Sequence, residues 1–390
     1  MHAVELFAGA GGLGMGVSKA GFSPVQIVEW DRWCCDTINT NRIRKISPVA
    51  NWPEPTFGDV RPVAFTHLEG EVDLVSGGPP CQPFSLGGKH KAFDDKRDMW
   101  PEAVRAVREI RPKAFIFENV KGMTRASFAT YFSYIVLQLH HPAIKRGAEE
   151  TWENHFARLE QHHTSDGRKA PEYKVVSRVL NGADFGVPQK RERVFFVGFR
   201  SDLKIAWQFP NGTHDRDALL WDKFRSGEYW DRHEVAVDDR IILPGEQRRA
   251  MSIASKPTTK PWRTVRDAIS KFPEPSTERD CAIYSNHRLQ PGAKAYKGHT
   301  GSHIDQPAKT LKAGVHGVPG GENMLRLPNG DVRYFSVRES AALQTFPDNY
   351  DLNGSWSEAM RQIGNAVPVD LAATIANAVK EKLYPQNGRN

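Results

Sequence analysis

A cysteine that follows two prolines is the residue best placed to do chemistry in this chain. Cys81 lies in the run Gly77-Gly78-Pro79-Pro80-Cys81-Gln82-Pro83-Phe84-Ser85, directly after the apolar residues 72–75. Such an apolar run is typical of a buried parallel strand, and open α/β sheets bind ligands at the carboxyl ends of their strands. A thiol held there is a candidate nucleophile, whereas an isolated cysteine is more often a small buried structural residue.

A carboxylate follows the next apolar run in the same way. Glu118 comes directly after residues 114–117. If the two strands are neighbours, Glu118 and Cys81 emerge at the same edge of the sheet. Burial at the end of an apolar strand would raise the pKa of this carboxyl, which could then donate a proton near neutral pH. The alternative is a helix-capping or surface glutamate.

Two arginines precede the last apolar run of the first half. Arg191 and Arg193 are two positions apart in an extended segment, so their side chains share one face. Two guanidinium groups on one face can bind a carbonyl oxygen, a carboxylate or a phosphate. The alternative is a solvated run of charges.

The first strand runs into a glycine-rich loop, Phe7-Ala8-Gly9-Ala10-Gly11-Gly12-Leu13-Gly14. Glycines let the backbone approach a ligand and open a helix whose N-terminus faces it. Glu29, about 20 residues on, could accept hydrogen bonds from both hydroxyls of a ribose. Trp30 could stack on an adenine, and Asp59 could bind the adenine amino group. The order of these features predicts a nucleotide-type cofactor, against the alternative of tight turns and ordinary loop carboxylates.

Strands and helices must alternate to position these residues. Apolar runs predict strands at 3–7, 25–30, 72–76, 114–118, 174–180 and 194–199, with helical stretches such as 100–110 between them. This alternation predicts a doubly wound α/β sheet over residues 1–200. Residues 121–172, which are richer in His, Arg and Glu, are expected to form a helical insertion on it.

The pattern changes after residue 200. Apolar periodicity weakens over 201–331 and Gly, Pro, Trp and Arg accumulate, which predicts a second, smaller domain of long loops and short strands. Residues 332–390 contain three helical patterns, 336–344, 357–363 and 370–383, and the last is expected to pack back on the first domain.

Composition sets the broad class. The chain has 390 residues, 39% hydrophobic and 25% charged, with a net charge of +7. It lacks an apolar stretch of the ~20 residues that a membrane span needs, and its N-terminus does not resemble a signal peptide. The four cysteines do not have zinc-site spacing, so we expect no metal and a reducing cytosol. The charge permits a nucleic-acid partner without requiring one.

Taken in order, these motifs resemble those of the cytosine-5 DNA methyltransferases. Phe7 to Gly12 resembles the family's cofactor loop, Pro80-Cys81-Gln82 its proline–cysteine motif, and Glu118-Asn119-Val120 its Glu-Asn-Val motif. Gln189, Arg191 and Arg193 match the Gln-x-Arg-x-Arg motif. Further matches are Arg338-Glu339-Ser340 with Phe346-Pro347, and Gly364-Asn365-Ala366-Val367-Pro368. The resemblance spans residue 3 to about 380 and leaves 121–172 and 201–331 least constrained.

The resemblance implies a Rossmann-like S-adenosylmethionine-dependent methyltransferase sheet with a smaller, irregular, mostly β target-recognition domain at 201–331. It implies S-adenosyl-L-methionine as cofactor and S-adenosyl-L-homocysteine as product. The implied cofactor-binding residues are Phe7, Gly9, Ala10, Gly11, Gly12, Glu29, Trp30, Asp59, Val60, Gly78, Pro80, Asn365 and Ala366.

The resemblance also implies the catalytic roles. Cys81 would add to carbon 6 of cytosine and Glu118 would hold or protonate ring N3. Arg193, with Arg191 behind or beside it, would bind the O2 carbonyl. The cytosine must leave the base stack to reach these groups. The DNA-binding residues implied are Gln82, Ser85, Lys89, Lys91, Lys309, Thr310 and Leu311.

We therefore expect a monomeric, cytoplasmic prokaryotic enzyme that methylates double-stranded DNA. The compact length favours the modification half of a restriction–modification pair, with a cognate endonuclease acting on the same DNA site. Two alternatives stay open. One is a tRNA cytosine-5 methyltransferase, whose Cys-Phe-Thr element is not found here. The other is a non-catalytic DNA-binding relative, which typically lacks the cysteine or the cofactor loop.

Overall fold

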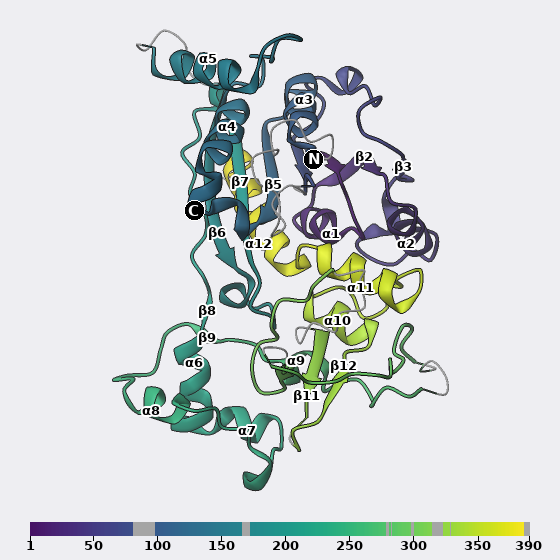
Figure 1. Ribbon diagram of the computed structural model, residues 1–390, viewed down its shortest axis with the longest axis vertical. Helices are drawn as coiled ribbons and strands as arrows, with labels where there is room; N and C mark the ends of the chain where they lie inside the picture. The colour runs from purple at the N-terminus through teal and green to yellow at the C-terminus, as the bar shows by residue number, and fades with distance from the viewer. Residues whose placement is uncertain are drawn as a thin grey trace.

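The computed structural model describes residues 1–80, 98–165, 172–277, 281, 283–297, 300–313, 323–327 and 329–385. Within these residues the six predicted strands and one unpredicted short strand, β3, form one seven-stranded sheet in the order β3-β2-β1-β4-β5-β7-β6 (Figure 1). Its strands are β1 (His2–Leu6), β2 (Ser23–Glu29), β3 (Thr56–Phe57), β4 (Leu74–Gly77), β5 (Ala114–Val120), β6 (Tyr173–Asn181) and β7 (Glu192–Arg200). The first five pair in parallel, and β7 runs antiparallel to both β5 and β6.

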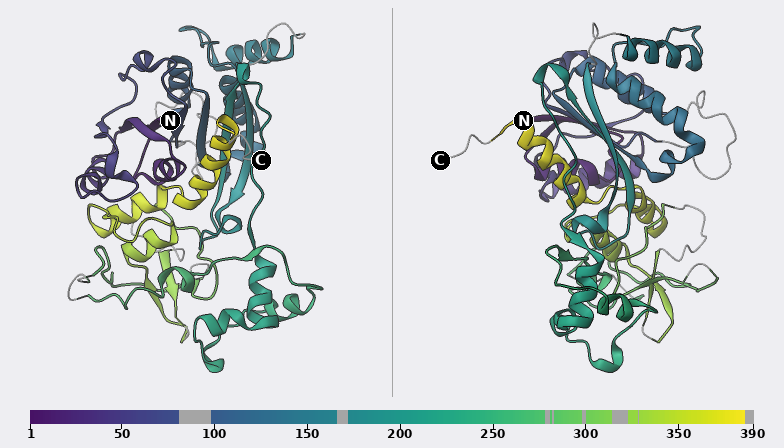
Figure 2. Two further views of the ribbon diagram at one scale, coloured as in Figure 1. Left: turned by 180° about the vertical axis from the view of Figure 1, so that it is seen from behind. Right: turned by 90° about the vertical axis from the view of Figure 1, so that its left-hand side faces the viewer.

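Helices cover both faces of this sheet, which confirms the doubly wound α/β expectation. They are α1 (Gly12–Lys19), α2 (Arg32–Ile43), α3 (Trp100–Ile110), α4 (Ala129–His140) and α12 (Val369–Leu383). Strand side chains alternate between the faces: Val75 and Phe115 pack with α3 and α4, whereas Leu74 and Ile116 pack with α1 and α12. Figure 2 shows the sheet between these layers.

Over the described residues 121–165 of the expected insertion, the main elements are the helix α4 and a second helix, α5 (Trp152–Thr164). Helix α4 lies in the sheet core through Ile135 and Leu139, and α5 packs on α4. His155 and Leu159 are the buried side of α5, and His155 Nδ1 lies 2.8 Å from the hydroxyl of Tyr134. In Figure 1 α5 lies at the end of the molecule remote from the second domain.

The second domain is irregular, but it is not mostly β in the part that the structure describes. Its strands are short, β8 (His214–Asp215), β9 (Lys260–Pro261), β10 (Ser302–His303), β11 (Met324–Arg326) and β12 (Val332–Tyr334). Between them lie the helices α6 (Arg216–Trp221), α7 (Glu228–Arg232), α8 (Glu246–Met251) and α9 (Val265–Ile269). The reason is local packing: Leu219, Tyr229, Trp230 and Val235 form a small core of their own, which short helices enclose.

The boundary at residue 200 also shifts. Trp207 and Phe209 still pack in the core formed by the sheet and α12, so the chain leaves the first domain only after them. The sequence placed the boundary at the end of the last apolar run because two isolated aromatic residues give no periodic signal.

The three C-terminal helices lie close to their predicted positions. Helix α10 (Val337–Leu343) begins at Ser336, whose side chain and that of Glu339 form a reciprocal cap, and α11 (Trp356–Asn365) precedes α12. Helices α10 and α11 share one core with α9 and Leu311 of the second domain and with Ala8 and Ile38 of the first. Across the described ranges, none of the helices has the length and apolar character of a membrane span.

Candidate active site

The glycine-rich loop and the acid at the end of β2 lie in direct contact. Gly11 caps α1 with a left-handed φ of 89°, a conformation that favours glycine. The amide of Gly9 donates to Glu29 Oε2 at 2.7 Å, and the amide of Asp31 donates to Glu29 Oε1 at 2.8 Å. Glu29 is buried, which raises its pKa, and these two amide donors oppose that rise. The loop and the carboxylate therefore form one preformed cradle.

Two aromatic side chains stand exposed beside this carboxylate. Trp30 is 75% exposed and Phe57 is 61% exposed, and Phe57 pairs with Glu29 across β2 and β3. Sequence reasoning missed Phe57, although it directly precedes Gly58-Asp59. A flat, apolar ligand group packed against either ring would bury it, so the two rings are candidates for contact with an adenine.

Asp59 and Val60, two further predicted cofactor-binding residues, differ in how accessible their side chains are to a ligand. Asp59 is exposed, and Arg61 Nη1 lies 2.7 Å from its Oδ2. The side chain of Val60 is buried in the core with Phe65, and its carbonyl oxygen accepts a bond from Arg105 at 2.9 Å. Val60 therefore supports this edge through groups that are already engaged.

The segment after α11 reaches the start of α1. A Cβ atom placed on Gly12 would lie 2.4 Å from the carbonyl oxygen of Val367, so the two backbones touch. Asn365 is exposed at this contact's N-terminal side and Ala366 is buried. Residues more than 350 positions apart in the chain are thus brought to one place.

The strand that leads into Cys81 runs beside Glu118. Gly77 pairs with Phe117 in parallel, so Gly78 and Glu118 follow at the same level. A Cβ atom on Gly78 would lie 3.5 Å from Glu118 Oε2, and Asn119 Nδ2 donates to the carbonyl of Pro79 at 2.9 Å. Pro80 is the last described residue before the cysteine. The candidates Cys81, Gln82, Ser85, Lys89 and Lys91 lie outside the described residues.

Glu118 and Arg193 form a buried ion pair. Arg193 Nε lies 2.9 Å from Glu118 Oε1, and the two side chains are 13% and 8% exposed. Burial raises the pKa of Glu118, while Arg193 and Arg191 oppose that rise. A carboxyl whose pKa is raised holds its proton to a higher pH than an ordinary glutamate does and can pass it to a base bound beside it.

Arg191 lies behind Arg193, not beside it. Its side chain is fully buried, and its guanidinium donates to the carbonyl oxygens of Leu311 at 3.1 Å and Gly364 at 2.6 Å. The prediction that Arg191 is a catalytic residue therefore needs correction. The structure assigns it to positioning, because its donors hold backbone segments from two other parts of the chain.

The Lys309-Thr310-Leu311 element lies along the same arginine segment. Thr310 Oγ1 donates to the carbonyl of Lys190 at 2.7 Å, and the amide of Leu311 donates to Gln189 Oε1 at 3.0 Å. The Leu311 side chain is 1% exposed and lies in the core, so its expected contact with DNA is wrong. A leucine that follows a lysine and a threonine gives no sign of which way it points. Lys309 is half-buried at the domain junction.

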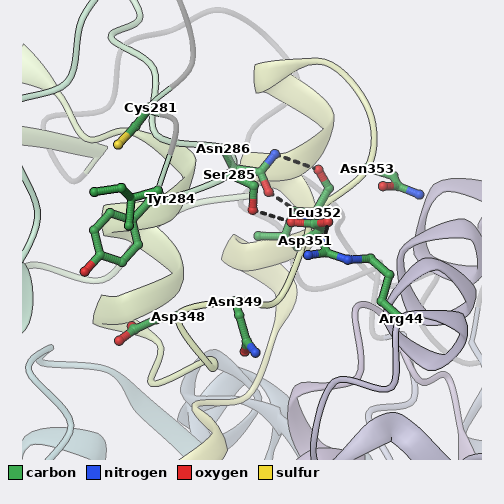
Figure 3. A pocket seen from close by; sticks show the side chains of 11 residues that line it. Arg44, Cys281, Tyr284, Ser285, Asn286, Asp348, Asn349, Asp351, Leu352 and Asn353 are labelled. Carbon is green, nitrogen blue, oxygen red and sulfur yellow. Dashed lines mark hydrogen bonds and ion pairs between the residues drawn. The ribbon is translucent and has the colours of Figure 1, made fainter.

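The cavity in Figure 3 is not lined by the candidate site residues. It has a volume of about 630 Å³ between Arg44 and the loops that carry Ser285 and Asp351. Its polar groups bond to one another: Asn286 Nδ2 donates to the carbonyl of Leu352 at 3.0 Å, and Arg44 pairs with Asp351. It contains none of the predicted site residues.

The chain is similar to known proteins along nearly its whole length. The family described as C-5 cytosine-specific DNA methylase matches residues 1–141 and 157–381. The unmatched stretch, 142–156, falls inside the expected insertion. The chain is 34% identical over 383 residues to the type II methyltransferase M.PspPI of a Psychrobacter species, covering 96% of this chain and 78% of that one. It is 32% identical to M.Eco47II of Escherichia coli, with 99% and 80% covered.

Solved structures share the fold. The Dnmt2 methyltransferase of S. pombe superimposes with a TM-score of 0.57 at 16% identity, covering 98% of this chain and 99% of that one. The methyltransferase EhMeth of Entamoeba histolytica gives a TM-score of 0.55 at 14% identity, with 98% of each chain covered.

Proposed function

Since the chain belongs to the C-5 cytosine-specific DNA methylase family, and is a DNA (cytosine-5) methyltransferase, we propose that Cys81 is its nucleophile and that Glu118 and Arg193 bind the target ring. The observation that carries this proposal is the buried Glu118–Arg193 pair, whose carboxyl lies beside Gly78, three residues before Cys81.

The proposed reaction begins with the Cys81 thiolate. Its sulfur forms a bond to carbon 6 of cytosine as the C5–C6 double bond opens, and Glu118 gives its proton to N3, so that carbon 5 can act as the nucleophile. Arg193 donates to the O2 carbonyl and keeps the ring in the plane of the carboxyl. After methyl transfer, a water molecule acting as base takes the carbon 5 proton; the electrons of that C–H bond restore the C5–C6 double bond, the Cys81 thiolate is expelled, and the N3 proton returns to Glu118.

The cradle around the glycine loop fits the cofactor that the family uses. S-adenosyl-L-methionine, when bound, supplies an electrophilic methyl group. Glu29 faces the loop as a buried hydrogen-bond acceptor suited to the ribose hydroxyls, and Trp30 and Phe57 offer their rings to the adenine. Asp59 and Asn365 are exposed polar residues available to the cofactor, and the backbone of Gly9 to Gly12 allows close approach.

We further propose that the substrate is double-stranded DNA and that the enzyme acts beside a cognate restriction endonuclease in the cytosol of a prokaryotic cell. Both similar relatives named above are type II methyltransferases. Lys309 and Thr310 stand at the domain junction, where they could meet DNA phosphates, and Lys89 and Lys91, which lie outside the described residues, are assigned the same role. The target base must be flipped out, because its carbon 6 is inaccessible in a stacked duplex.

Transfer of a labelled methyl group from S-adenosyl-L-methionine tests this function. Wild-type enzyme should label duplex DNA at cytosine and leave tRNA unlabelled, Cys81→Ser should give no product, and Cys281→Ser should match wild type. Bisulfite sequencing of the product identifies the recognised site. Product from Cys81→Ser, or label in tRNA and not in DNA, would refute the proposal.

A further inference from the structure

A carboxyl group that has no role in the mechanism above is buried in β1, an interior strand of the sheet. Glu5 is the fourth of the five residues of β1 and is 2% exposed. Its neighbour in the alternation, Ala3, packs with α1 and α12, so Glu5 points to that face. Burying a carboxyl costs free energy unless it is neutral or well bonded, and an ordinary sheet would have an apolar residue here.

Glu5 contacts the two elements that flank β1. Ser76 of β4, its partner in the strand register, donates from Oγ to Glu5 Oε2. The amide of Gly14 in α1 also faces the carboxyl, and a Cβ atom on Gly14 would lie 3.3 Å from Glu5 Cδ. Oε1 is buried and has no hydrogen-bond partner among the described residues. Burial raises the pKa of Glu5 to about 8, so the group is mostly neutral at pH 7.

The level of this contact in the sheet matters for the site. Glu5 lies two residues before Phe7, where the cofactor loop begins, and Ser76 lies two residues before Gly78, which runs beside Glu118. Both segments leave the sheet at the same edge. The Glu5–Ser76 bond therefore joins β1 and β4 two residues before each strand reaches the candidate site. The Gly14 amide links α1, the helix that follows the loop, to the same carboxyl.

We propose that Glu5 is a positioning residue for methyl transfer. Its neutral, buried carboxyl sets the spacing between the cofactor loop and the strand that leads to Cys81. The proposal rests on the proposed function, since that function places the methyl donor on one of these segments and the nucleophile on the other. Reacting groups must be positioned to within a fraction of an ångström, so a small change in this spacing is costly for the reaction.

Three variants test the role of Glu5: Glu5→Gln, which keeps shape and neutrality; Glu5→Ala, which removes the link; and Glu153→Gln, the same exchange at an exposed position of α5. Binding of S-adenosyl-L-homocysteine and of duplex DNA is measured by calorimetry, and kcat and KM by methyl transfer. Glu5→Ala should weaken binding of S-adenosyl-L-homocysteine by about tenfold and lower kcat by about 100-fold. Its affinity for DNA should stay within about twofold of wild type. Glu5→Gln should restore both, and Glu153→Gln should match wild type.

A pH series separates positioning by a neutral group from positioning by a charge. The folded protein holds a proton on Glu5 that the unfolded chain, with a pKa near 4.5, has released, so wild type loses stability as pH rises from about 4.5 to about 8. Glu5→Gln has no such group. The melting temperature of Glu5→Gln minus that of wild type should therefore increase as the pH rises through this interval, and it should stay constant at higher pH.

The proposal is overturned if folded Glu5→Ala binds the product and turns over like wild type. It is equally overturned if Glu5→Gln is as impaired as Glu5→Ala, because a charge would then be needed. A fall in melting temperature for Glu5→Ala with unchanged product affinity and kcat would show a purely structural role and would also refute it. Because product binding is measured without turnover, an inactive wild type would refute the proposed function alone.

Discussion

The proton on Glu118 is the feature on which the chemistry of single residues depends. Arg193 Nε lies 2.9 Å from this carboxyl, and an arginine ordinarily holds a carboxyl in its ionised form. In this pair burial dominates and the pKa of Glu118 is raised. In the proposed mechanism the pair would thus supply a proton donor for ring N3 and a cation for the O2 carbonyl at neighbouring positions.

Because the raised pKa keeps Glu118 protonated at pH values where an ordinary glutamate is ionised, kcat/KM should fall on the alkaline side as this proton is lost. Glu118→Gln can donate a hydrogen bond but cannot transfer a proton, so its kcat should drop by about 100-fold and the alkaline decline should disappear. The measurement is a pH–rate profile, with Glu71→Gln, an exposed residue, as the matched exchange. An unchanged alkaline limb in Glu118→Gln would assign the proton to another group.

At the scale of elements, the extended segment 189–193 is the junction of the molecule. Arg191 bonds to Leu311 of the second domain and to Gly364 at the end of α11, while Arg193, two residues on, reaches Glu118 of β5. Alternation along the segment puts both guanidinium groups on one face. The segment therefore fixes the second domain and the C-terminal helices relative to the site.

The two arginines should respond differently to the same exchange. Arg191→Lys leaves one buried ammonium to serve two carbonyls, which should lower the free energy of unfolding by about 3 kcal/mol. Arg193→Lys should change stability by about 1 kcal/mol or less but lower kcat, because a lysine cannot pair with Glu118 and O2 through a planar fork. Urea unfolding and single-turnover rates distinguish them. Equal stability losses would contradict this division of roles between the two arginines.

At the scale of the whole molecule, the last helix closes the fold onto the first. Helix α12 packs on α1 so closely that a Cβ atom on Gly16 would lie 2.4 Å from the Cβ of Ala372. The chain enters α12 through the segment whose Val367 touches Gly12 in the cofactor loop. The contacts that pack α12 and the segment before it against α1 therefore both close the fold and shape the cofactor cradle.

Gly16→Ala should force α12 away from α1. We expect a loss of about 1–3 kcal/mol in the free energy of unfolding, together with weaker binding of S-adenosyl-L-homocysteine. Gly147→Ala is the matched control: its Cβ would lie 3.4 Å from Glu150, an ordinary contact on an exposed loop, so its stability should stay within about 0.5 kcal/mol of wild type. Full stability of Gly16→Ala would contradict the close packing.

The sequence predicted well those features that a short window contains. Continuous apolar runs located every strand of the sheet except the two-residue β3, and their polar ends located Glu29 and Glu118. It could not predict contacts that only tertiary packing decides. Arg191 and Gly364 are 173 positions apart, and nothing near either residue marks the other as its partner. For the same reason Leu311 was expected to face DNA and instead lies in the core.

The second domain was least predictable. Its helices are only five or six residues long, too short for a 3.6-residue period to emerge, and its small core draws on Leu219 and on Tyr229, Trp230 and Val235 further along the chain. Weak periodicity was therefore interpreted as short strands. The exposed ring of Phe57 was missed because a single aromatic residue before a glycine carries no pattern.

The most direct test of the central claim is covalent capture on duplex DNA that contains 5-fluorocytosine at the recognised site. Fluorine replaces the hydrogen at carbon 5, and a base cannot remove it as it removes a proton. The elimination therefore stops, and the sulfur–carbon 6 bond should persist after methyl transfer. We predict a denaturation-resistant complex with wild-type enzyme and S-adenosyl-L-methionine, and mass spectrometry should find the base on Cys81. A complex formed equally by Cys81→Ser, or a base attached to another residue, would contradict this claim.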